Sequence, residues 1–168
     1  MPTDLPDTPS DGSSAEEPRW LDADERETWL ALSCVITRLP GALDSQLQRD
    51  AGLSFFGYMV LAVLAEHPER TLQMSDLAFL ANGSLSRVSH IVKRLENQGF
   101  LRREPHPDDG RLTNAILTGV GYDKVVAAAP GHVAHVRALV LDALSPEERA
   151  QLARISRSIE ENIASDGK

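Results

Sequence analysis

The stretch SLSRVSHIVKRLENQGFLRREPHPDDGRLTNAILT, from Ser84 to Thr118, joins a helical pattern to a hairpin pattern. Apolar residues recur at helical spacing as far as Gln98, and two short β-tolerant runs at 100–104 and 112–117 then flank a cluster of Pro, Asp and Gly. The stretch therefore predicts a helix followed by a two-stranded hairpin.

The charge of this stretch is opposite to that of the whole chain. The 168 residues carry a net charge of -8, but residues 1–27 alone hold nine acidic and two basic side chains, so the remainder is nearly neutral. Within 84–117 six basic residues outnumber four acidic ones. The basic residues are Arg87, Lys93, Arg94, Arg102, Arg103 and Arg111. A locally basic helix and hairpin point to a nucleic-acid partner.

The N-terminal region predicts an acidic tail followed by a long helix. Residues 1–20 are rich in Pro, Ser, Asp and Gly and hold few apolar side chains, so we expect a disordered acidic tail. Asp22 and Glu25 form a variant of the capping box at the start of a helix over 21–50. Pro40–Gly41 predict a kink or a short break within that helix.

Two more helices and a short strand are predicted before the basic helix. Ser54 is the expected cap of a helix that continues to Ala65, a small strand follows at 71–72, and a third helix covers 74–80. Asn82–Gly83 supply left-handed turn residues. The order helix, turn, helix, hairpin is that of a winged helix-turn-helix, whose second helix enters the major groove of DNA.

Two helices are predicted after the hairpin. Thr118 caps the first, which we expect to bend or break at Pro130–Gly131 before it resumes through Leu144, and SPEE at 145–148 starts the second. Apolar stripes on these helices comprise Leu139, Val140, Leu141, Leu144, Leu152, Ile155, Ile159 and Ile163. A winged domain of this size need not bury them alone, so they indicate a dimer.

Candidate DNA contacts lie on the basic helix and at the hairpin tip. The expected buried seam of the helix consists of Leu85, Val88, Val92 and Leu95. The polar residues left on the surface are Ser84, Ser86, Arg87, Ser89, His90, Lys93 and Arg94. Arg111 is expected to enter the minor groove or to bind phosphates, with Asp109 paired to an arginine to hold the wing.

The stretch from Gly52 to Gly121 resembles the MarR family of bacterial transcriptional regulators, and the likeness extends from about Leu21 to Asn162. Its most specific element is the wing signature Asp-x-Arg followed by Leu-Thr-x-x-Gly. That signature is met by Asp109, Arg111, Leu117, Thr118 and Gly121. The sequence departs from the family pattern at Ala115, Gly110 and Pro40, and the first two departures are expected to loosen the wing.

The resemblance implies a mainly α fold with a small β wing, and an obligate homodimer with interleaved N- and C-terminal helices. Residues 21–168 then form a single domain, with the winged helix-turn-helix at 54–118 and dimerisation helices at 21–50 and 119–164. Such a dimer binds an inverted-repeat operator in double-stranded DNA, with half-sites about one helical turn, ~10 base pairs, apart. The implied function is a transcriptional regulator that represses.

Family members respond to small molecules, often phenolic or other aromatic acids, in a pocket between the dimerisation helices and the winged domain. The candidates for this pocket by rough position are Trp29, Ser33, Tyr58 and His132. Ordinary packing or surface exposure is the alternative for each of the four. Release of DNA by such an effector is the mode of regulation that the resemblance implies.

Two alternatives to an effector-controlled DNA-binding protein stay open. A thiol-based redox sensor would use Cys34, although its neighbours in sequence carry no charge that stabilises a thiolate, which favours a buried structural thiol. A winged-helix protein-interaction module without DNA binding is the other, and the acidic tail slightly supports it. The salt dependence of operator binding separates the second alternative from the regulator.

Several other classes of function find no support in the sequence. No phosphate-binding glycine loop, zinc-protease motif or nucleophile motif occurs, so we expect no enzymatic activity and no cofactor. His132 and His135 are spaced for one helix face but have no clear third ligand, so no metal site is predicted. No long apolar run or signal peptide is visible, and we expect a cytoplasmic protein.

Overall fold

The computed structural model describes residues 18–166, and the chain divides into two parts, one ending at Ile36 and the other beginning at Thr37. Most of the expected disordered tail at 1–20 therefore lies outside the described residues. Helix α1 (Ala23–Ala51) runs across the division and continues through Pro40, so the short break allowed for at this position is absent. Leu43 and Leu47 are buried just after the proline, and their packing holds the second half of the helix.

The described N-terminal part, 18–36, holds the first turns of α1. The amide of Asp22 donates to Glu25 Oε2 at 3.1 Å and the amide of Glu25 donates to Asp22 Oδ1 at 2.8 Å, which confirms the predicted capping box. Trp20, Trp29, Val35 and Ile36 are each more than half exposed in the single chain. The apolar side chains of this part are therefore largely exposed in the single chain.

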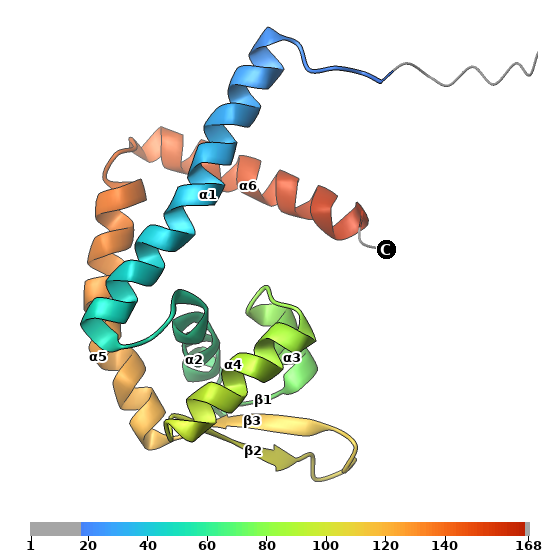
Figure 1. The fold of residues 1–168 in the computed structure, drawn as a ribbon, viewed down its shortest axis with the longest axis vertical. Coiled ribbons are helices and arrows are strands. Elements are labelled where there is room, and N and C mark those ends of the chain that lie inside the picture. The colour runs from blue at the N-terminus through green and yellow to red at the C-terminus, as the bar shows by residue number, and fades with distance from the viewer. Residues whose placement is uncertain (1–17, 167–168) are drawn as a thin grey trace, which may run out of the picture. The chain divides into compact units, whose positions relative to one another are not determined.

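The core of the larger part lies between three helices and a small sheet. Helices α2 (Phe55–Glu66), α3 (Met74–Leu80) and α4 (Leu85–Asn97) pack against the sheet, and Figure 1 shows the hairpin loop reaching out beyond them. The most deeply buried side chains include Leu47, Val60, Leu61, Leu64, Leu77, Val88, Val92, Leu101 and Ala115. Ser54 caps α2 through a hydrogen bond from the amide of Gly57 at 3.0 Å, as predicted.

The sheet has three antiparallel strands in the order β1-β3-β2. They are β1 (Thr71–Gln73), β2 (Leu101–Pro105) and β3 (Thr113–Leu117), close to the predicted runs. Ala115 lies in the central strand between Leu72 and Arg103 and is fully buried. A small side chain at this position is therefore enclosed by the core and by both neighbouring strands.

Helix α5 (Gly119–Val136) continues through Pro130, so the predicted interruption at Pro130–Gly131 is not a break in the helix. The irregularity comes later, in a wide π-helical segment η1 (Arg137–Leu141). There the backbone amide of Asp142 donates to the carbonyl of Arg137 at 2.8 Å. The side chains of the same two residues also form an ion pair, with an N–O distance of 2.8 Å. Both bonds span five residues, which matches the wider turn.

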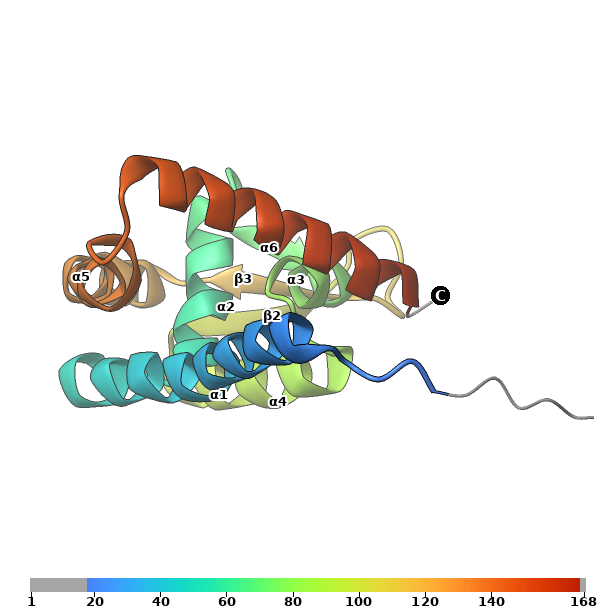
Figure 2. The same cartoon turned by 90° about the horizontal axis from the view of Figure 1, so that it is seen from above.

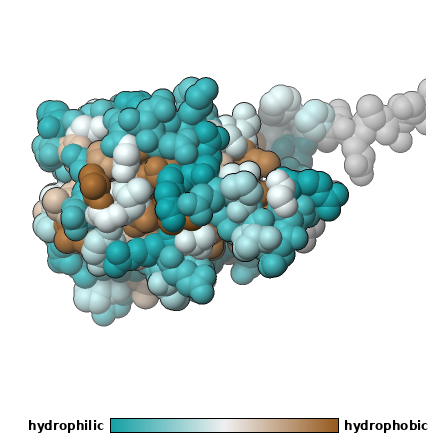
Figure 3. All heavy atoms as spheres, turned by 90° about the horizontal axis from the view of Figure 1, so that it is seen from below, coloured by the Kyte–Doolittle hydropathy of each residue, from teal (hydrophilic) through white to brown (hydrophobic). Residues whose placement is uncertain are grey.

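Helix α6 (Pro146–Asp166) follows α5 and η1 after a short turn (Figure 2). The amide of Ser145 donates to Glu148 Oε2 at 2.7 Å and that of Glu148 to Ser145 Oγ at 3.2 Å, so the predicted capping box is confirmed. No helix within residues 18–166 is long and apolar enough to cross a membrane. Figure 3 shows one face of the molecule, where hydrophilic residues enclose smaller apolar areas.

Candidate nucleic-acid interface

Helix α4 is the second helix of the helix-turn-helix. The turn before it contains Asn82 at a φ of 51°, and Ser84 caps the helix by accepting a hydrogen bond from the amide of Arg87 at 3.2 Å. The buried seam consists of Val88, Ile91, Val92 and Leu95. Leu85 was predicted to belong to this seam but is 54% exposed, because it lies in the first turn of the helix, beyond the edge of the core.

The predicted polar contacts of α4 are displayed on its outer surface. Ser84, Ser86, Arg87, His90, Lys93 and Arg94 are exposed, and Ser89 is half-buried. At the C-terminal end of the helix a shallow cavity of about 450 Å³ is lined by His90, Lys93, Arg94, Asn97 and Gln98. Apart from Leu85, the outer face of α4 is therefore polar, and its exposed charged side chains, Arg87, Lys93 and Arg94, are all basic.

The wing consists of β2, β3 and the loop at 106–112, and Arg111 lies in its tip. The guanidinium of Arg111 donates to both carboxylate oxygens of Asp109 at 3.0 Å, which confirms that Asp109 pairs with an arginine. These hydrogen bonds hold the pKa of Asp109 below its usual value. The loop is closed by local bonds, from the amide of His106 to the carbonyl of Leu112 and from the amide of Leu112 to that of Asp109, both 2.9 Å.

The base of the wing is bonded to α4. Glu96 of α4 accepts hydrogen bonds from the amide of Arg103 at 3.0 Å and from its guanidinium at 2.9 and 2.7 Å. The pKa of Glu96 is lowered, mainly by the side-chain hydrogen bond from Arg103. This bidentate contact fixes the position of β2 relative to the helix.

A groove of about 280 Å³ separates α4 from the wing. It is lined by Gln73, Met74, Ser75, Leu85, Ser89, Arg103, Arg111, Leu112 and Thr113. Of these lining residues, Ser89 and Arg111 were predicted from the sequence as DNA contacts, whereas Gln73, Ser75 and Thr113 were not. Residues 73–75 belong to the short strand and the start of α3, where no charge or motif indicated proximity to the wing.

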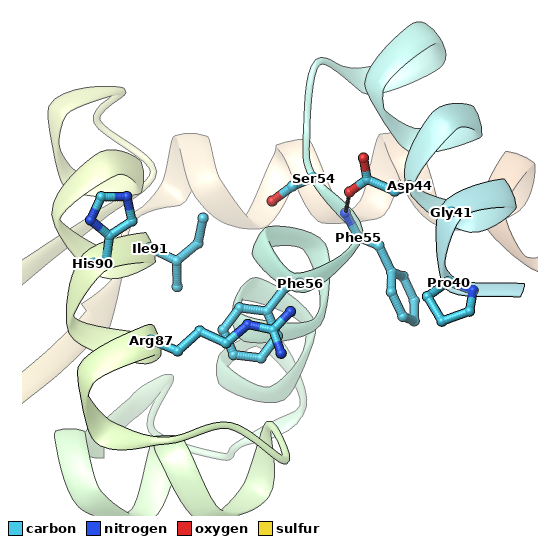
Figure 4. Close-up of a pocket in the computed structure, with 9 residues that line it drawn as sticks. All are labelled: Pro40, Gly41, Asp44, Ser54, Phe55, Phe56, Arg87, His90 and Ile91. Atoms are coloured by element: carbon cyan, nitrogen blue, oxygen red, sulfur yellow. Dashed lines mark hydrogen bonds between the residues drawn. The ribbon is translucent and has the colours of Figure 1, made fainter. Parts of the chain in front are cut away.

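Two of the four candidates for an effector pocket lie side by side in the larger part of the chain. Tyr58 and His132 are both buried, with ring centroids 4.6 Å apart, whereas Trp29 and Ser33 belong to the N-terminal part of the chain. A cavity of about 460 Å³ lies elsewhere in the larger part (Figure 4). Its lining consists of Pro40, Gly41, Asp44, Ser54, Phe55, Phe56, Arg87, His90 and Ile91.

Cys34 is exposed in the single chain, so the prediction of a buried thiol is wrong for it. The neighbouring Val35 and Ile36 are themselves 53% and 54% exposed. Apolar sequence neighbours therefore indicated an apolar helix face but not a buried one.

Comparison with known proteins supports the same reading of the fold. The MarR family model matches residues 52–112. Sco3205, a MarR family transcriptional regulator from Streptomyces coelicolor crystallised with DNA, is 46% identical with a TM-score of 0.84, over 88% of this chain and 92% of that chain. The HTH-type transcriptional regulator YfiV of Bacillus subtilis is 31% identical over 83% of this chain and 88% of its own length. YetL, an HTH-type transcriptional repressor of the same organism, is 23% identical over 86% and 85%.

A helix-turn-helix bonded to a two-stranded wing makes the molecule a winged helix-turn-helix protein. The likeness to Sco3205 and YfiV covers more than four fifths of the chain, and it identifies one family within the winged helix-turn-helix proteins. The chain belongs to the MarR family of transcriptional regulators.

Proposed function

We propose that the protein is a sequence-specific DNA-binding regulator that contacts DNA through α4 and the wing. The observation that carries the proposal is the groove between them, because it places Ser89 of α4 together with Arg103 and Arg111 of the wing. Arginine binds phosphate bidentately, and the exposed polar face of α4 suits the major groove. The structure determined for Sco3205 with DNA supports this assignment.

The roles of the individual side chains follow from their places. Ser84 and Ser86 lie at the N-terminal end of α4, where hydroxyl groups and the helix dipole favour phosphate. The remaining candidates on the helix are Arg87, Ser89, His90, Lys93 and Arg94. Arg111 at the wing tip is placed to reach the minor groove or its phosphates, with Asp109 limiting its orientation.

The active form in this proposal is a homodimer on an inverted repeat. From Ala150 to Asp166 every residue of α6 is exposed in the single chain, including four large apolar side chains. They are Leu152, Ile155, Ile159 and Ile163, at helical spacing on one face. Dimerisation through 21–50 and 119–164 would cover them and would leave 54–118 to read the DNA.

The proposal includes repression and its relief by a small aromatic or phenolic acid. Repression is supported by the name of the relative YetL. The cavity in Figure 4 has aromatic walls from Phe55 and Phe56 and basic groups from Arg87 and His90, which suit a carboxylate on an aromatic ring. The proposal places the protein in the cytoplasm, with the chromosome.

The test is binding of the purified full chain to DNA from its own upstream region, compared with a scrambled duplex at several salt concentrations. We expect specific binding that falls steeply with salt, and in Arg111→Ala a weaker affinity with a salt slope smaller by about one. Arg157→Ala removes the same charge from α6 and is the matched control, with no expected effect. Absence of specific binding at low salt, to this DNA and in a genome-wide selection, would favour a protein-interaction module instead.

A further inference from the structure

The side chain of Arg87 has a different kind of partner from Arg103 and Arg111, the two arginines that line the groove between α4 and the wing. Arg103 and Arg111 are each bonded to a carboxylate, whereas Arg87 has no ion pair among the described residues. Its guanidinium lies over the ring of Phe56 in α2, with Cζ 4.0 Å from the ring centroid (Figure 4). This distance is well within the range of a cation–π contact.

We propose that Phe56 is a positioning residue for DNA recognition, and that it acts by holding the guanidinium of Arg87 in a fixed orientation. The proposal rests on the proposed function, in which α4 binds DNA. Stacking occupies only a face of the guanidinium and leaves its in-plane N–H donors available for a phosphate or a guanine. A side chain that is already ordered loses less conformational entropy when it binds.

The position of the ring depends on the turn before α4. A Cβ on Gly83 would lie 2.5 Å from Cζ and 3.1 Å from Cε2 of Phe56, so the end of the ring occupies space that any other residue would fill. The backbone of Arg87 is fixed separately, because its amide donates to the cap residue Ser84. Gly83 and Phe56 therefore set the side-chain direction of Arg87, while Ser84 sets its backbone.

The geometry explains why this contact depends on the ring rather than on apolar packing alone. The half-buried Phe56 and the exposed Arg87 belong to different helices, and only the face of the ring is in contact with the guanidinium. Replacement by leucine keeps an apolar side chain but removes the π-electrons. Tyrosine is unsuitable, because its hydroxyl would extend from Cζ toward Gly83.

The test is a double-mutant cycle on the full chain with an operator duplex selected by the wild-type protein. We expect Phe56→Leu to weaken binding about threefold to tenfold, and 2,6-difluorophenylalanine at position 56, which weakens the π-face and leaves Cζ and both Cε atoms unchanged, to weaken it about twofold. In an Arg87→Ala background neither change should weaken binding further. Thermal midpoints of all variants show whether any loss comes from unfolding.

Each outcome decides a separate question. An equal loss from the Phe56 changes with and without Arg87, or no loss from the fluorinated ring while Arg87→Ala weakens binding, would overturn the positioning role. If Arg87→Ala itself binds as tightly as the wild type, the DNA contact proposed for Arg87 is wrong, and the positioning role of Phe56 is overturned with it. Because the fluorinated ring keeps the end that packs against Gly83, the test stands even if Phe56→Leu does not fold.

Discussion

Gly121 lies in the first turn of α5, where the helix passes the backbone of Phe100. A Cβ at this position would overlap the carbonyl oxygen of Phe100, whereas a Cβ on Gly119 would meet no atom within 4 Å. We expect Gly121→Ala to lower the free energy of unfolding by about 1–3 kcal/mol, and Gly119→Ala to leave it nearly unchanged. Urea unfolding of the two variants measures the difference, and equal stabilities would show that the close approach is absent.

His132 is a buried histidine whose Nδ1 has no hydrogen-bond partner among the described residues. Burial lowers its pKa from the ordinary 6.5, and the nearby His135 lowers it further. The unfolded chain then binds a proton more readily, so the contribution of His132 to stability is full above pH 6.5 and declines as the pH falls from there toward the lowered value. We expect His132→Gln to flatten the pH dependence of the urea midpoint in this window, and an unchanged slope would contradict the assignment.

The single residues that sequence reasoning placed correctly are those whose partners lie within a few positions. The capping pairs at 22–25 and 145–148 and the pair of Asp109 with Arg111 all follow from local spacing. The position of Leu85 and the stacking of Phe56 on Arg87 depend on where the core ends and on contacts between helices. No periodicity within one segment contains that information.

Glu96 of α4 is bonded to Arg103 of β2 through both the guanidinium and the backbone amide of the arginine. Because the pKa of Glu96 is lowered, its contribution to stability is present above the ordinary value of 4.5 and is lost as the pH falls through the lowered value. The side chain of Glu96 is 29% exposed and that of Arg103 is 38% exposed, so we expect Glu96→Gln to lower the free energy of unfolding by no more than about 1 kcal/mol at neutral pH. At a pH well below 4.5 the difference should vanish.

Glu104→Gln provides the matched control for that prediction. Glu104 pairs with Arg102 at 3.2 Å within β2, with both side chains 52% exposed, and so links no two elements. We expect no measurable change in the urea midpoint of this variant. A loss as large as that of Glu96→Gln would show that general charge balance, rather than the connection to α4, is responsible.

The first residues of the helices were predicted more accurately than their continuity. Caps fix the starts of α2, α4 and α5 through short-range hydrogen bonds, and these agree with the predictions. A kink or short break was expected at Pro40 and a bend or break at Pro130, and the structure shows no break at either proline. A proline removes one backbone bond, and the packing of the following turn decides whether the helix survives that loss.

The exposed face of α6 bears on the assembly of the whole molecule. A glutamate in place of Ile159, in the middle of that face, would place a charge in any interface that covers it. We expect Ile159→Glu to shift the protein from dimer to monomer, whereas Arg157→Glu on the opposite side of the helix should leave the dimer intact. Analytical ultracentrifugation over a range of concentrations distinguishes them, and a stable Ile159→Glu dimer would move the interface elsewhere.

The wing combines a fixed base with a self-contained tip. Its base is held by Glu96, whereas the bonds that shape the loop at 106–112 join residues of that loop to one another. Substitutions in the loop therefore change what the tip presents without disturbing the packing beneath it. If the wing binds DNA as proposed, the preference for the DNA that flanks a half-site can diverge between related proteins while the fold and its stability stay constant.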